Sequence, residues 1–218
     1  MNQHTMVKRQ KAFFNKHAEK WMDIWYKNPK ARNRSRFRRE FKRLFALSPI
    51  RKNDVILDVG CGNGVLVPYI LRQLGTKGRL HEVDYADKMI EVNRRLHTGP
   101  RIKFYVANVN DLPLKNKSCD GIFCFSCFPH FHDKARALRA LATVLKTGGW
   151  LLLAHFDSPE ALNHHHASSH TAVKHDCMPD EAAMRSLFTD AGLAIIRHVN
   201  KNGFYAVLAK RYGYSLNP

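Results

Sequence analysis

The stretch Val55-Ile-Leu-Asp58-Val59-Gly60-Cys61-Gly62-Asn63-Gly64 decides the fold of this 218-residue chain. Its first half is a short apolar run, which is typical of a buried strand. Its second half carries a glycine at every other position, so the backbone can turn sharply and approach a ligand without a Cβ in the way. We therefore predict that a strand ends at this turn, that a helix follows, and that the turn binds a ligand.

Downstream of this turn, strand-like and helix-like segments alternate. The strand-like runs are 80–84, 102–107, 121–126 and 150–156, and the helix-like segments are 65–74, 87–96, 134–145 and 179–191. Strands that alternate with helices form a parallel sheet with helices on both faces. Two further runs, 194–199 and 204–211, flank the turn signal 200–203 and predict an antiparallel hairpin. The pattern predicts an α/β, Rossmann-like, doubly wound and mostly parallel sheet of seven strands, with a C-terminal antiparallel hairpin at its edge.

The first 50 residues have a different pattern and predict two amphipathic helices. The first spans about 10–27, and the residues near one face are Phe13, Phe14, His17, Trp21, Ile24 and Trp25. The second begins near Ser35, and its apolar stripe consists of Phe37, Phe41, Leu44 and Phe45. Apolar faces of this kind must be buried against something. We expect residues 1–50 to form a basic helical extension that serves as a lid, and residues 51–218 to form the α/β domain.

The positive charge is concentrated in the same N-terminal segment. Residues 1–52 hold 16 Lys or Arg against three acidic residues, which is +13 of the formal net charge of +18. Such a segment can steer a protein to RNA, to an anionic membrane surface or to an acidic substrate. A pair of solvated helices with no such partner explains the charge equally well.

Cysteine usage and hydropathy point to a reduced, aqueous compartment. No run of 18 apolar residues is present, and the first residues lack the apolar stretch of a signal peptide. Five scattered cysteines suggest free thiols rather than a disulfide framework. The pair Cys124-x-x-Cys127 can be a redox or metal pair or the end of an apolar strand. We expect a cytoplasmic protein without a transmembrane segment.

The glycine turn differs from a dinucleotide-binding loop. Counted from Gly60, the sixth position is Val65, where the G-x-G-x-x-G fingerprint needs glycine to accommodate a pyrophosphate. The pattern D-x-G-x-G-x-G from Asp58 to Gly64 resembles the loop of class I S-adenosylmethionine-dependent methyltransferases. In that resemblance, residues 51–218 are the class I methyltransferase domain and S-adenosylmethionine is the cofactor.

Further segments match the family in order and spacing. Asp84 ends the second strand, where a carboxylate can accept hydrogen bonds from both ribose hydroxyls. The segment 107–113 resembles the family's G-D-A-x-x-L-P segment, with Asn108 where the family has Asp and an amide carbonyl that can bond the adenine amino group. Residues 144–149 resemble V-L-K-P-G-G, with Thr147 in place of proline. The resemblance implies these cofactor-binding residues: Asp58, Gly60, Cys61, Gly62, Asp84, Tyr85, Asn108, Val109 and Phe125.

Within this class the chain looks most like small-molecule methyltransferases related to the ubiquinone and menaquinone C-methylating enzymes. The segment AFFNKHAEKW, residues 12–21, resembles their substrate-covering N-terminal helix. The resemblance implies an enzyme that transfers a methyl group from S-adenosylmethionine to a small-molecule acceptor. The sulfonium makes that methyl group electrophilic, so the protein needs mainly to align a nucleophile and, in some cases, to remove a proton.

The segments after the fourth and fifth strands are rich in histidine. Eight of the 13 histidines lie between 130 and 175. Ligands of open α/β sheets bind beyond the carboxyl ends of the strands, so we predict that His130, His155 and His166 meet near the methyl donor, with Asp176 orienting one of them. They can serve as a general base or as metal ligands. In the alternative interpretation several of them, His164 and His165 first, are solvent-exposed loop residues. No tight metal-binding spacing is present, and we assign no metal site.

Two rival functions use the same fold. An RNA methyltransferase would use the basic N-terminal segment to bind nucleic acid. Amino-group methylation of nucleic acids is typically associated with [DN]-P-P-[YF] after the fourth strand, whereas this chain has Ser126-Cys-Phe-Pro129-His130. A non-catalytic cofactor-binding regulator would fit the substitutions Asn108 and Thr147, while the intact loop and Asp84 argue against it. The sequence leaves the accepting atom open.

Overall fold

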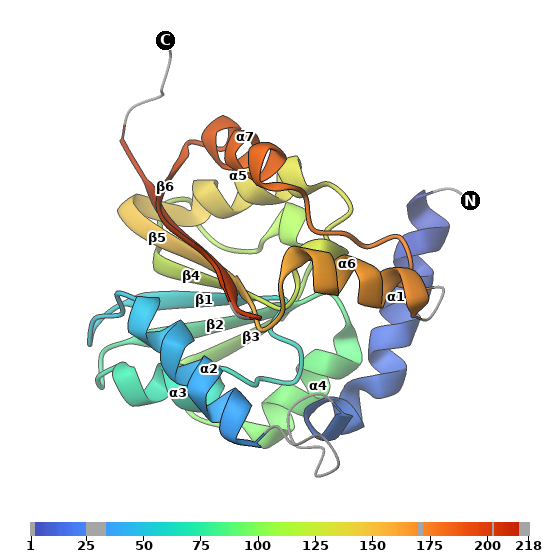
Figure 1. Cartoon of the computed structure of the whole chain (residues 1–218). Coiled ribbons are helices and arrows are strands. Elements are labelled where there is room, and N and C mark those ends of the chain that lie inside the picture. Colours follow the sequence, from blue (N-terminus) through green and yellow to red (C-terminus); the bar gives the residue numbers. More distant parts are fainter. Residues whose placement is uncertain (1–2, 25–33, 170–171, 202, 214–218) are drawn as a thin grey trace.

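The computed structural model describes residues 3–24, 34–169, 172–201 and 203–213. They form one seven-stranded sheet with the strand order β3-β2-β1-β4-β5-β7-β6 (Figure 1). The strands are β1 (Val55–Val59), β2 (Arg79–Asp84), β3 (Ile102–Val106), β4 (Cys119–Phe125), β5 (Leu145–His155), β6 (Leu193–Asn200) and β7 (Tyr205–Arg211). Strands β1 to β5 pair in parallel, and β7 pairs antiparallel with both β5 and β6. The predicted fold class is confirmed.

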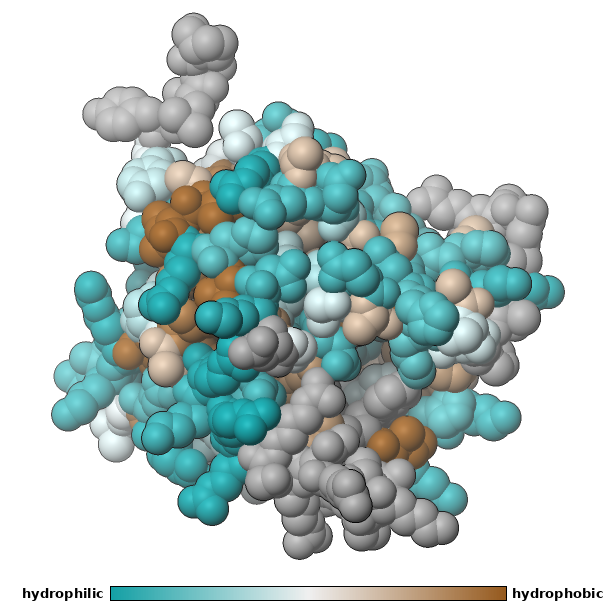
Figure 2. Space-filling view, viewed as in Figure 1, coloured by the Kyte–Doolittle hydropathy of each residue, from teal (hydrophilic) through white to brown (hydrophobic). Residues whose placement is uncertain are grey.

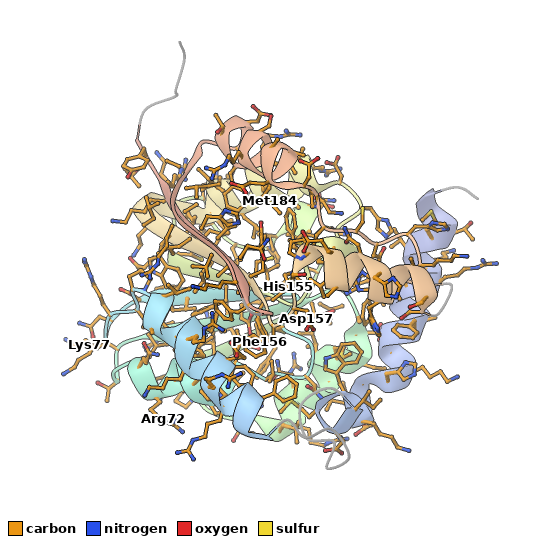
Figure 3. The ribbon with its side chains drawn as sticks, in the orientation of Figure 1. Arg72, Lys77, His155, Phe156, Asp157 and Met184 are labelled. Carbon is orange, nitrogen blue, oxygen red and sulfur yellow. The ribbon has the colours of Figure 1, made fainter. Side chains whose placement is uncertain are left out.

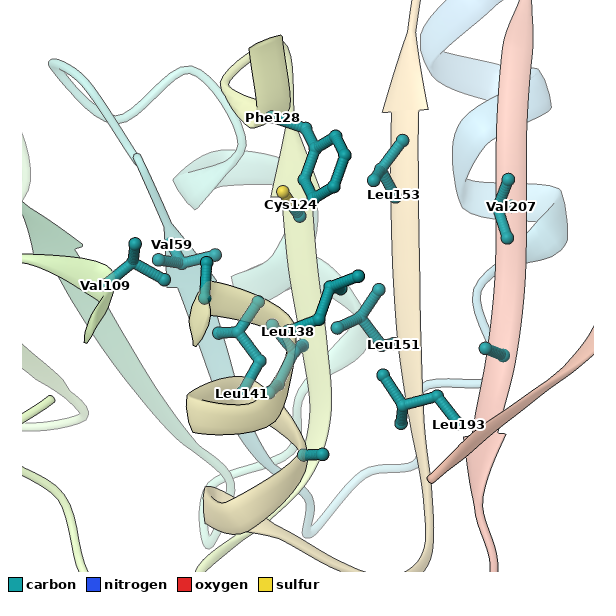
Figure 4. Packing of buried hydrophobic residues seen from close by; sticks show 14 of the residues in the cluster. Val59, Val109, Cys124, Phe128, Leu138, Leu141, Leu151, Leu153, Leu193 and Val207 are labelled. Carbon is teal, nitrogen blue, oxygen red and sulfur yellow. The ribbon is translucent and has the colours of Figure 1, made fainter. Parts of the chain in front are cut away.

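Helices cover both faces of the sheet. They are α1 (Gln3–His17), α2 (Arg34–Leu47), α3 (Val67–Gln73), α4 (Asp87–Leu96), α5 (Lys134–Val144), α6 (Pro159–Ser168) and α7 (Glu181–Asp190). Helices α2 and α3 pack on one face through Phe41, Leu44 and Ile70. Helices α5 and α7 pack on the other face, where α5 places Leu138 and Leu141 over β4 and β5 (Figure 4). The sheet is therefore buried on both sides, as parallel strands require.

The N-terminal helices differ in their limits from the expected ones. Helix α1 begins at Gln3, earlier than the predicted residue 10. It ends at His17 and is followed by a 3-10 helix over Ala18–Lys20. Trp25, assigned to its apolar face, lies outside the described residues, as does Asn202 of the predicted turn. Helix α2 starts at Arg34, one residue before the predicted start, and its stripe is buried or half-buried.

Helix α6 was not predicted, and its sequence explains why. It contains three consecutive histidines and few large apolar residues, so it shows no clear 3.6-residue period. Its start is nevertheless well capped. The Ser158 side chain accepts a hydrogen bond from Ala161 N at 3.3 Å, and Pro159 occupies the first turn. The helix carries the histidine-rich segment across the carboxyl ends of the strands.

Helix α1 lies beside α4 and α6 at the carboxyl ends of the strands (Figure 1). Phe14 and Ala18 are buried against Met89 of α4 and Val173 of the segment after α6. The Asn63 side chain of the glycine turn donates to the Ala18 carbonyl oxygen at 3.0 Å. The apolar face of α1 is thus buried over the edge of the sheet where ligands of this fold class bind.

The outer surface of α2 is polar and basic. Arg38, Arg39 and Lys42 are exposed, and Figure 2 shows hydrophilic residues gathered over this helix. Within the described part of the chain, no helix is both long enough and apolar enough to cross a bilayer.

We expect Gly121→Ala to lower the free energy of unfolding by about 1 to 3 kcal/mol, because overpacking a filled core forces neighbouring atoms to move. A Cβ at Gly121 in β4 would overlap the indole of Trp150 in β5. Urea unfolding measures the loss. In a Trp150→Leu background the same substitution should cost clearly less; an equal cost in both backgrounds would contradict the steric explanation.

Candidate functional site

A cavity of about 400 Å³ lies at the carboxyl ends of β1, β2, β3 and β4. This size is within the range of small-molecule sites. All nine residues predicted to hold the cofactor line it: Asp58, Gly60, Cys61, Gly62, Asp84, Tyr85, Asn108, Val109 and Phe125. Four loops that are distant in sequence thus meet at one site, because the parallel strands before them end at the same edge.

The glycine turn forms the floor of this cavity. Gly60 and Gly62 have φ of +64° and +55°, in the left-handed region that favours glycine. A Cβ at Gly60 would also lie 2.5 Å from the Cβ of Cys127, so that position has no room for a side chain. The backbone N–H of Cys61 donates to the Val83 carbonyl oxygen at 3.1 Å and ties the turn to β2.

The Asp84 carboxylate faces the cavity from the end of β2. Its Oδ2 accepts a hydrogen bond from Gly62 N at 2.9 Å, and its Oδ1 accepts one from Ala86 N at 2.8 Å. Burial raises the pKa of this carboxyl to about 6, and the two backbone N–H groups oppose the rise. Each oxygen keeps acceptor capacity, so the group can take hydrogen bonds from two neighbouring hydroxyls, as a ribose presents.

The Asp58 carboxylate provides a second, independent indication of the ligand. It is 2% exposed, and its Oδ2 has no hydrogen-bond partner within the described residues. Burial, with Glu82 on the neighbouring strand, raises its pKa well above the usual range. A buried acceptor without a partner is costly. A cationic ligand would satisfy it, and S-adenosylmethionine carries both a sulfonium and an ammonium group. The cavity therefore fits this cofactor.

Asn108 lies at the place expected for the adenine-binding residue, and its side-chain oxygen already accepts one hydrogen bond. Its Oδ1 accepts a hydrogen bond from Asn110 N at 2.9 Å and caps the 3-10 helix Val109–Asp111. A carbonyl oxygen has two lone pairs, so one remains, together with the amide N–H groups. The Asn108 side chain can thus both donate to and accept from a heterocyclic base.

A second cavity, of about 490 Å³, adjoins the first. Its walls are mainly aromatic and imidazole side chains. Four residues line both cavities: Phe14, Trp21, Ser126 and His130. His155, which ends β5, and His166 of α6 line the second cavity, and Figure 3 shows His155, Phe156 and Asp157 at the end of β5 beside α6. The two cavities meet at His130.

The structure brings His130, His166 and Asp176 into direct contact. His130 Nδ1 lies 2.7 Å from Asp176 Oδ2, and His166 Nδ1 lies 2.8 Å from the Asp176 main-chain oxygen. Both oxygens can only accept, so both Nδ1 atoms carry hydrogen when these bonds form. Each histidine then has its Nε2 lone pair available. The rings of His130 and His166 lie 5.1 Å apart between centroids.

The imidazoles of His155 and His166 are held neutral at physiological pH. Burial, with His130 and His166 nearby, lowers the pKa of His155 to about 3. Burial, and then His130, lowers the pKa of His166. His155 Nε2 is buried and has no partner within the described residues. These two side chains are therefore suited to hydrogen-bonding a ligand, while His130 is the one with a carboxylate partner.

The other described histidines of the cluster, His132, His164, His165 and His175, are exposed. His132 nevertheless lines the first cavity, and His165 reaches the rim of the second, where its ring lies 6.0 Å from that of His166 between centroids. His170 lies outside the described residues. The interpretation of His164 and His165 as solvent-exposed agrees with their positions. In the described ranges, no three His, Cys, Asp or Glu side chains gather as a metal site would require.

The cysteine pair packs as the end of an apolar strand. Cys124 and Cys127 are buried free thiols with their Sγ atoms 3.3 Å apart. Cys127 Sγ also lies 3.1 Å from the Val59 carbonyl oxygen. Burial raises the pKa of the Cys127 thiol, which keeps it protonated and unreactive.

Sequence reasoning missed Gln10, a polar residue of α1 that is 1% exposed. Its side chain contacts Tyr85 and Asp176, on two different sides of the site. The only signal in the sequence was a glutamine at the start of the aromatic face of α1. The pairing could not be read from the sequence, because its partners lie 75 and 166 residues away.

Comparison with known proteins agrees with this geometry. Residues 57–153 match the model of a family described as a methyltransferase domain. The chain is 24% identical over 193 residues to a ubiquinone/menaquinone biosynthesis C-methyltransferase of Enterobacter sp. (strain 638), covering 77% of each chain. It is 33% identical to a ubiquinone biosynthesis O-methyltransferase of Xanthomonas axonopodis pv. citri (strain 306), covering 52% of each.

Two solved structures with the same fold have the word methyltransferase in their names. One is a chain from the complex that the Trm112 methyltransferase activator of Haloferax volcanii forms with a methyltransferase; its TM-score is 0.74 at 19% identity, covering 91% of this chain and 97% of that one. Another is a SAM-dependent methyltransferase of Aquifex aeolicus, with a TM-score of 0.62 at 20% identity, covering 79% and 87%. At these identities the likeness concerns the fold.

We expect Asp84→Asn to weaken S-adenosylmethionine binding by about 1.5 to 3 kcal/mol, because a charged acceptor of two hydrogen bonds is lost. The wild-type affinity should fall between pH 7.5 and 5.5, since Asp84, with its pKa near 6, gains a proton there. The Asn variant should lose most of this pH dependence. Titration calorimetry at both pH values measures both effects.

The control is Asp87→Asn, which alters an exposed carboxylate of the same turn that contacts Lys11 and Asn15 of α1. It should leave the affinity within about twofold. Equal binding by wild type and Asp84→Asn would refute the ribose assignment.

Proposed function

We propose that this S-adenosylmethionine-dependent methyltransferase transfers the methyl group to a small-molecule acceptor held in the histidine-lined cavity. The observation that carries this proposal is the position of His130. It lines both cavities and has a buried carboxylate partner at 2.7 Å. A base at the junction of donor and acceptor sites is where a proton would have to leave an acceptor.

The residues around the first cavity would hold the cofactor in a fixed orientation. S-adenosylmethionine supplies an electrophilic methyl group when bound. Asp84 would accept the ribose hydroxyls, Asn108 would bind the adenine edge, and Asp58 would lie near the cationic part. Because two backbone N–H groups already hold the Asp84 carboxylate, little reorganisation of this group is needed on binding.

We assign His130 the role of general base in this proposal. Its Nδ1–H is held by Asp176, which leaves Nε2 free to accept a proton from the acceptor as its atom becomes nucleophilic. The carboxylate fixes the tautomer and stabilises the imidazolium that forms. The neutral His155 and His166 would orient the acceptor by hydrogen bonds. Phe14 would hold the His130 ring, since the two rings meet edge to face with centroids 5.1 Å apart.

The walls of the second cavity favour an acceptor with a flat apolar body and a weakly acidic polar group. Phe13, Phe14, Trp21, Phe37 and Phe156 supply apolar surface, and the imidazoles supply polar contacts at one side. A hydroxylated ring has this combination. The two relatives above are named for methylation at carbon and at oxygen in ubiquinone biosynthesis, which supports a ring-bearing acceptor.

The division into a helical lid, residues 1–50, and a methyltransferase domain, residues 51–218, belongs to the same proposal. Helix α1 provides Phe13 and Phe14 to the second cavity and Val7 and Gln10 to the first. We infer that this helix moves when ligands enter and that its closure excludes water from the reacting atoms.

The competing function is methylation of RNA through the basic surface. Arg38, Arg39 and Lys42 lie on the outer face of α2, whose inner face packs on the sheet. The acceptor cavity is instead lined by α1, α6 and the strand ends, and among the described residues α2 contributes to it only Phe37, which is not on the basic face. A basic surface separate from the aromatic cavity favours the small-molecule acceptor.

We expect His130→Ala to lower kcat by roughly 10²-fold or more while the affinity for S-adenosylmethionine changes little, because a general base is lost but not a cofactor contact. Cofactor-consumption assays with a panel of hydroxylated aromatic acceptors measure kcat, and calorimetry measures affinity. His164→Ala, an exposed residue of α6, is the control and should retain full activity. Unchanged kcat in His130→Ala would remove the base from the proposal.

We expect the triple variant Arg38→Gln, Arg39→Gln, Lys42→Gln to retain small-molecule methylation within about twofold, because exposed charges away from the cavity contribute little to binding there. Radiolabelled methyl transfer to an aromatic acceptor and to total RNA measures both functions. Salt-sensitive RNA methylation by the wild type that is lost in this variant would favour the nucleic-acid function.

A further inference from the structure

We propose that Gln10 is a positioning residue for His130, and that it makes the base competent only when α1 is closed over the cofactor turn. This inference rests on the proposed function, since it concerns the same base. It adds a residue of the lid to the reaction and states how the two ends of the site are connected.

Three short hydrogen bonds connect the cofactor side to the base. The Tyr85 hydroxyl lies 2.7 Å from Gln10 Oε1, Gln10 Nε2 lies 2.7 Å from Asp176 Oδ2, and the same Oδ2 lies 2.7 Å from His130 Nδ1. Tyr85 directly follows Asp84, the proposed ribose-binding residue. The series therefore runs from the β2–α4 turn, through α1, to the segment after α6 and the turn after β4.

Chemistry fixes the direction of every bond in this series. An ionised carboxylate only accepts, so the NH₂ side of the Gln10 amide must face Asp176. The carbonyl side then faces Tyr85, whose hydroxyl must donate. Burial, with Asp84 and Asp176 nearby, raises the pKa of Tyr85, which keeps that hydroxyl protonated. The same carboxylate oxygen then requires His130 to carry its hydrogen on Nδ1, which directs Nε2 away from Asp176 as an acceptor.

Burial makes this series different from a surface contact. Gln10 is 1% exposed and Asp176 is 8% exposed. If α1 moved away, both groups would exchange their partners for water. Asp176 would then be hydrated, and its hold on the His130 ring would weaken. Withdrawal of a buried hydrogen-bond partner leaves the other group unsatisfied, and this penalty favours the closed position of the helix.

Helix α1 has other contacts that do not reach the base. Asn15 Nδ2 donates to Asp87 Oδ1 at 3.1 Å, Asn15 Oδ1 accepts from Lys88 N at 3.1 Å, and Lys11 pairs with Asp87 at 2.7 Å. These bonds are exposed and hold α1 to α4. They provide a matched control, because a substitution at Asn15 removes only exposed contacts between α1 and α4, which contribute little to docking, and does not touch Asp176.

The charged and titratable groups around the His130–Asp176 pair come from several elements. Asp84 and Tyr85 face it from the end of β2, His155 from β5, His166 from α6, and His132 and Lys134 from the segment after β4. All remain in place in variants of position 10. A change in the pH dependence of such a variant is therefore assigned to the contact with Asp176.

The test compares Gln10→Leu, Gln10→Glu and Asn15→Ala in the full chain. Leu keeps the approximate volume and removes both bonds. We expect kcat to fall at least tenfold, the affinity for S-adenosylmethionine to stay within about twofold, and the acid limb of the pH–rate profile to move to lower pH by about 0.5 to 1 unit. The last effect arises because Asp176, no longer held by Gln10, orients His130 less well and stabilises its imidazolium form less.

Gln10→Glu separates positioning from packing. A protonated Glu can donate to Asp176 and accept from Tyr85 as glutamine does, whereas an ionised Glu cannot donate. We expect this variant to approach wild-type kcat at low pH and to lose activity as the pH rises, with an alkaline limb that the wild type lacks. Asn15→Ala should leave both limbs where they are and change kcat by less than about twofold.

A second measurement does not depend on activity. Nitrogen NMR of ¹⁵N-histidine-labelled protein reports the tautomer of His130, assigned by comparison with His130→Ala. We expect Nδ1–H in the wild type and in Asn15→Ala, and a mixture of tautomers in Gln10→Leu. Unaltered His130 signals together with an unmoved pH profile in Gln10→Leu would overturn the inference, as would a pH-independent loss of rate in Gln10→Glu.

The two proposals fail in different ways. If His130→Ala retained full kcat, the proposed base would be wrong whatever position 10 did. If His130→Ala lost activity while both Gln10 variants kept wild-type profiles and tautomers, the base would stand and the role of Gln10 would be refuted.

Discussion

The hydrogen bond from Gly62 N–H to the Asp84 carboxylate is the contact on which the rest of the site depends. It can form only because the chain turns back directly after β1, in a conformation that glycine adopts easily. The bond joins the ends of β1 and β2, orients Asp84 toward the cavity, and places Tyr85 opposite α1. Asn63, in the same turn, donates to the carbonyl oxygen of Ala18, which directly follows α1. One tight turn thus helps to determine where α1 lies and what it contacts.

The strands that lead into this part of the site also bring two acidic side chains together in the buried interior, which is unfavourable without a ligand. Asp58 and Glu82 are register partners on β1 and β2 and are both buried. Burial raises the pKa of Glu82 to about 8, although Asn93 donates to it at 2.7 Å. Because the folded chain holds this proton more tightly than the unfolded chain, stability is lost as the pH rises from the usual glutamate range through about 8. A cationic ligand offsets the repulsion between these two carboxyl groups. The arrangement therefore lowers the stability of the free protein and raises its affinity for such a ligand.

The sequence predicted what short-range rules control. Short apolar runs, the hairpin signal and the 3.6-residue period located β1 to β7 and most helices, and the spacing after Asp58 distinguished this turn from a dinucleotide loop. Asp84 could be placed because it ends a strand. Helix α6 escaped prediction because three histidines in a row interrupt any apolar period. Gln10 could not be recognised at all, since its role arises from contacts with residues far along the chain. The histidine cluster is an intermediate case, because the strand ends indicated where it lies. Only the three-dimensional structure could distinguish His130, which has a carboxylate partner, from the neutral His155 and His166.

In the proposed mechanism the base and the two groups that hold it come from three chain segments. The physical advantage of this arrangement is that it controls access of water. An imidazole whose carboxylate partner is always solvated is only modestly oriented, because water competes for the same oxygen. Here the turn after β4 supplies His130, the segment after α6 supplies Asp176, and α1 supplies the donor that completes the carboxylate shell. No two of these segments are adjacent in sequence, so none of them forms the dry environment alone. In the proposed mechanism His130 acquires its fixed tautomer when α1 is in place and excludes water, and this links proton removal to closure of that helix.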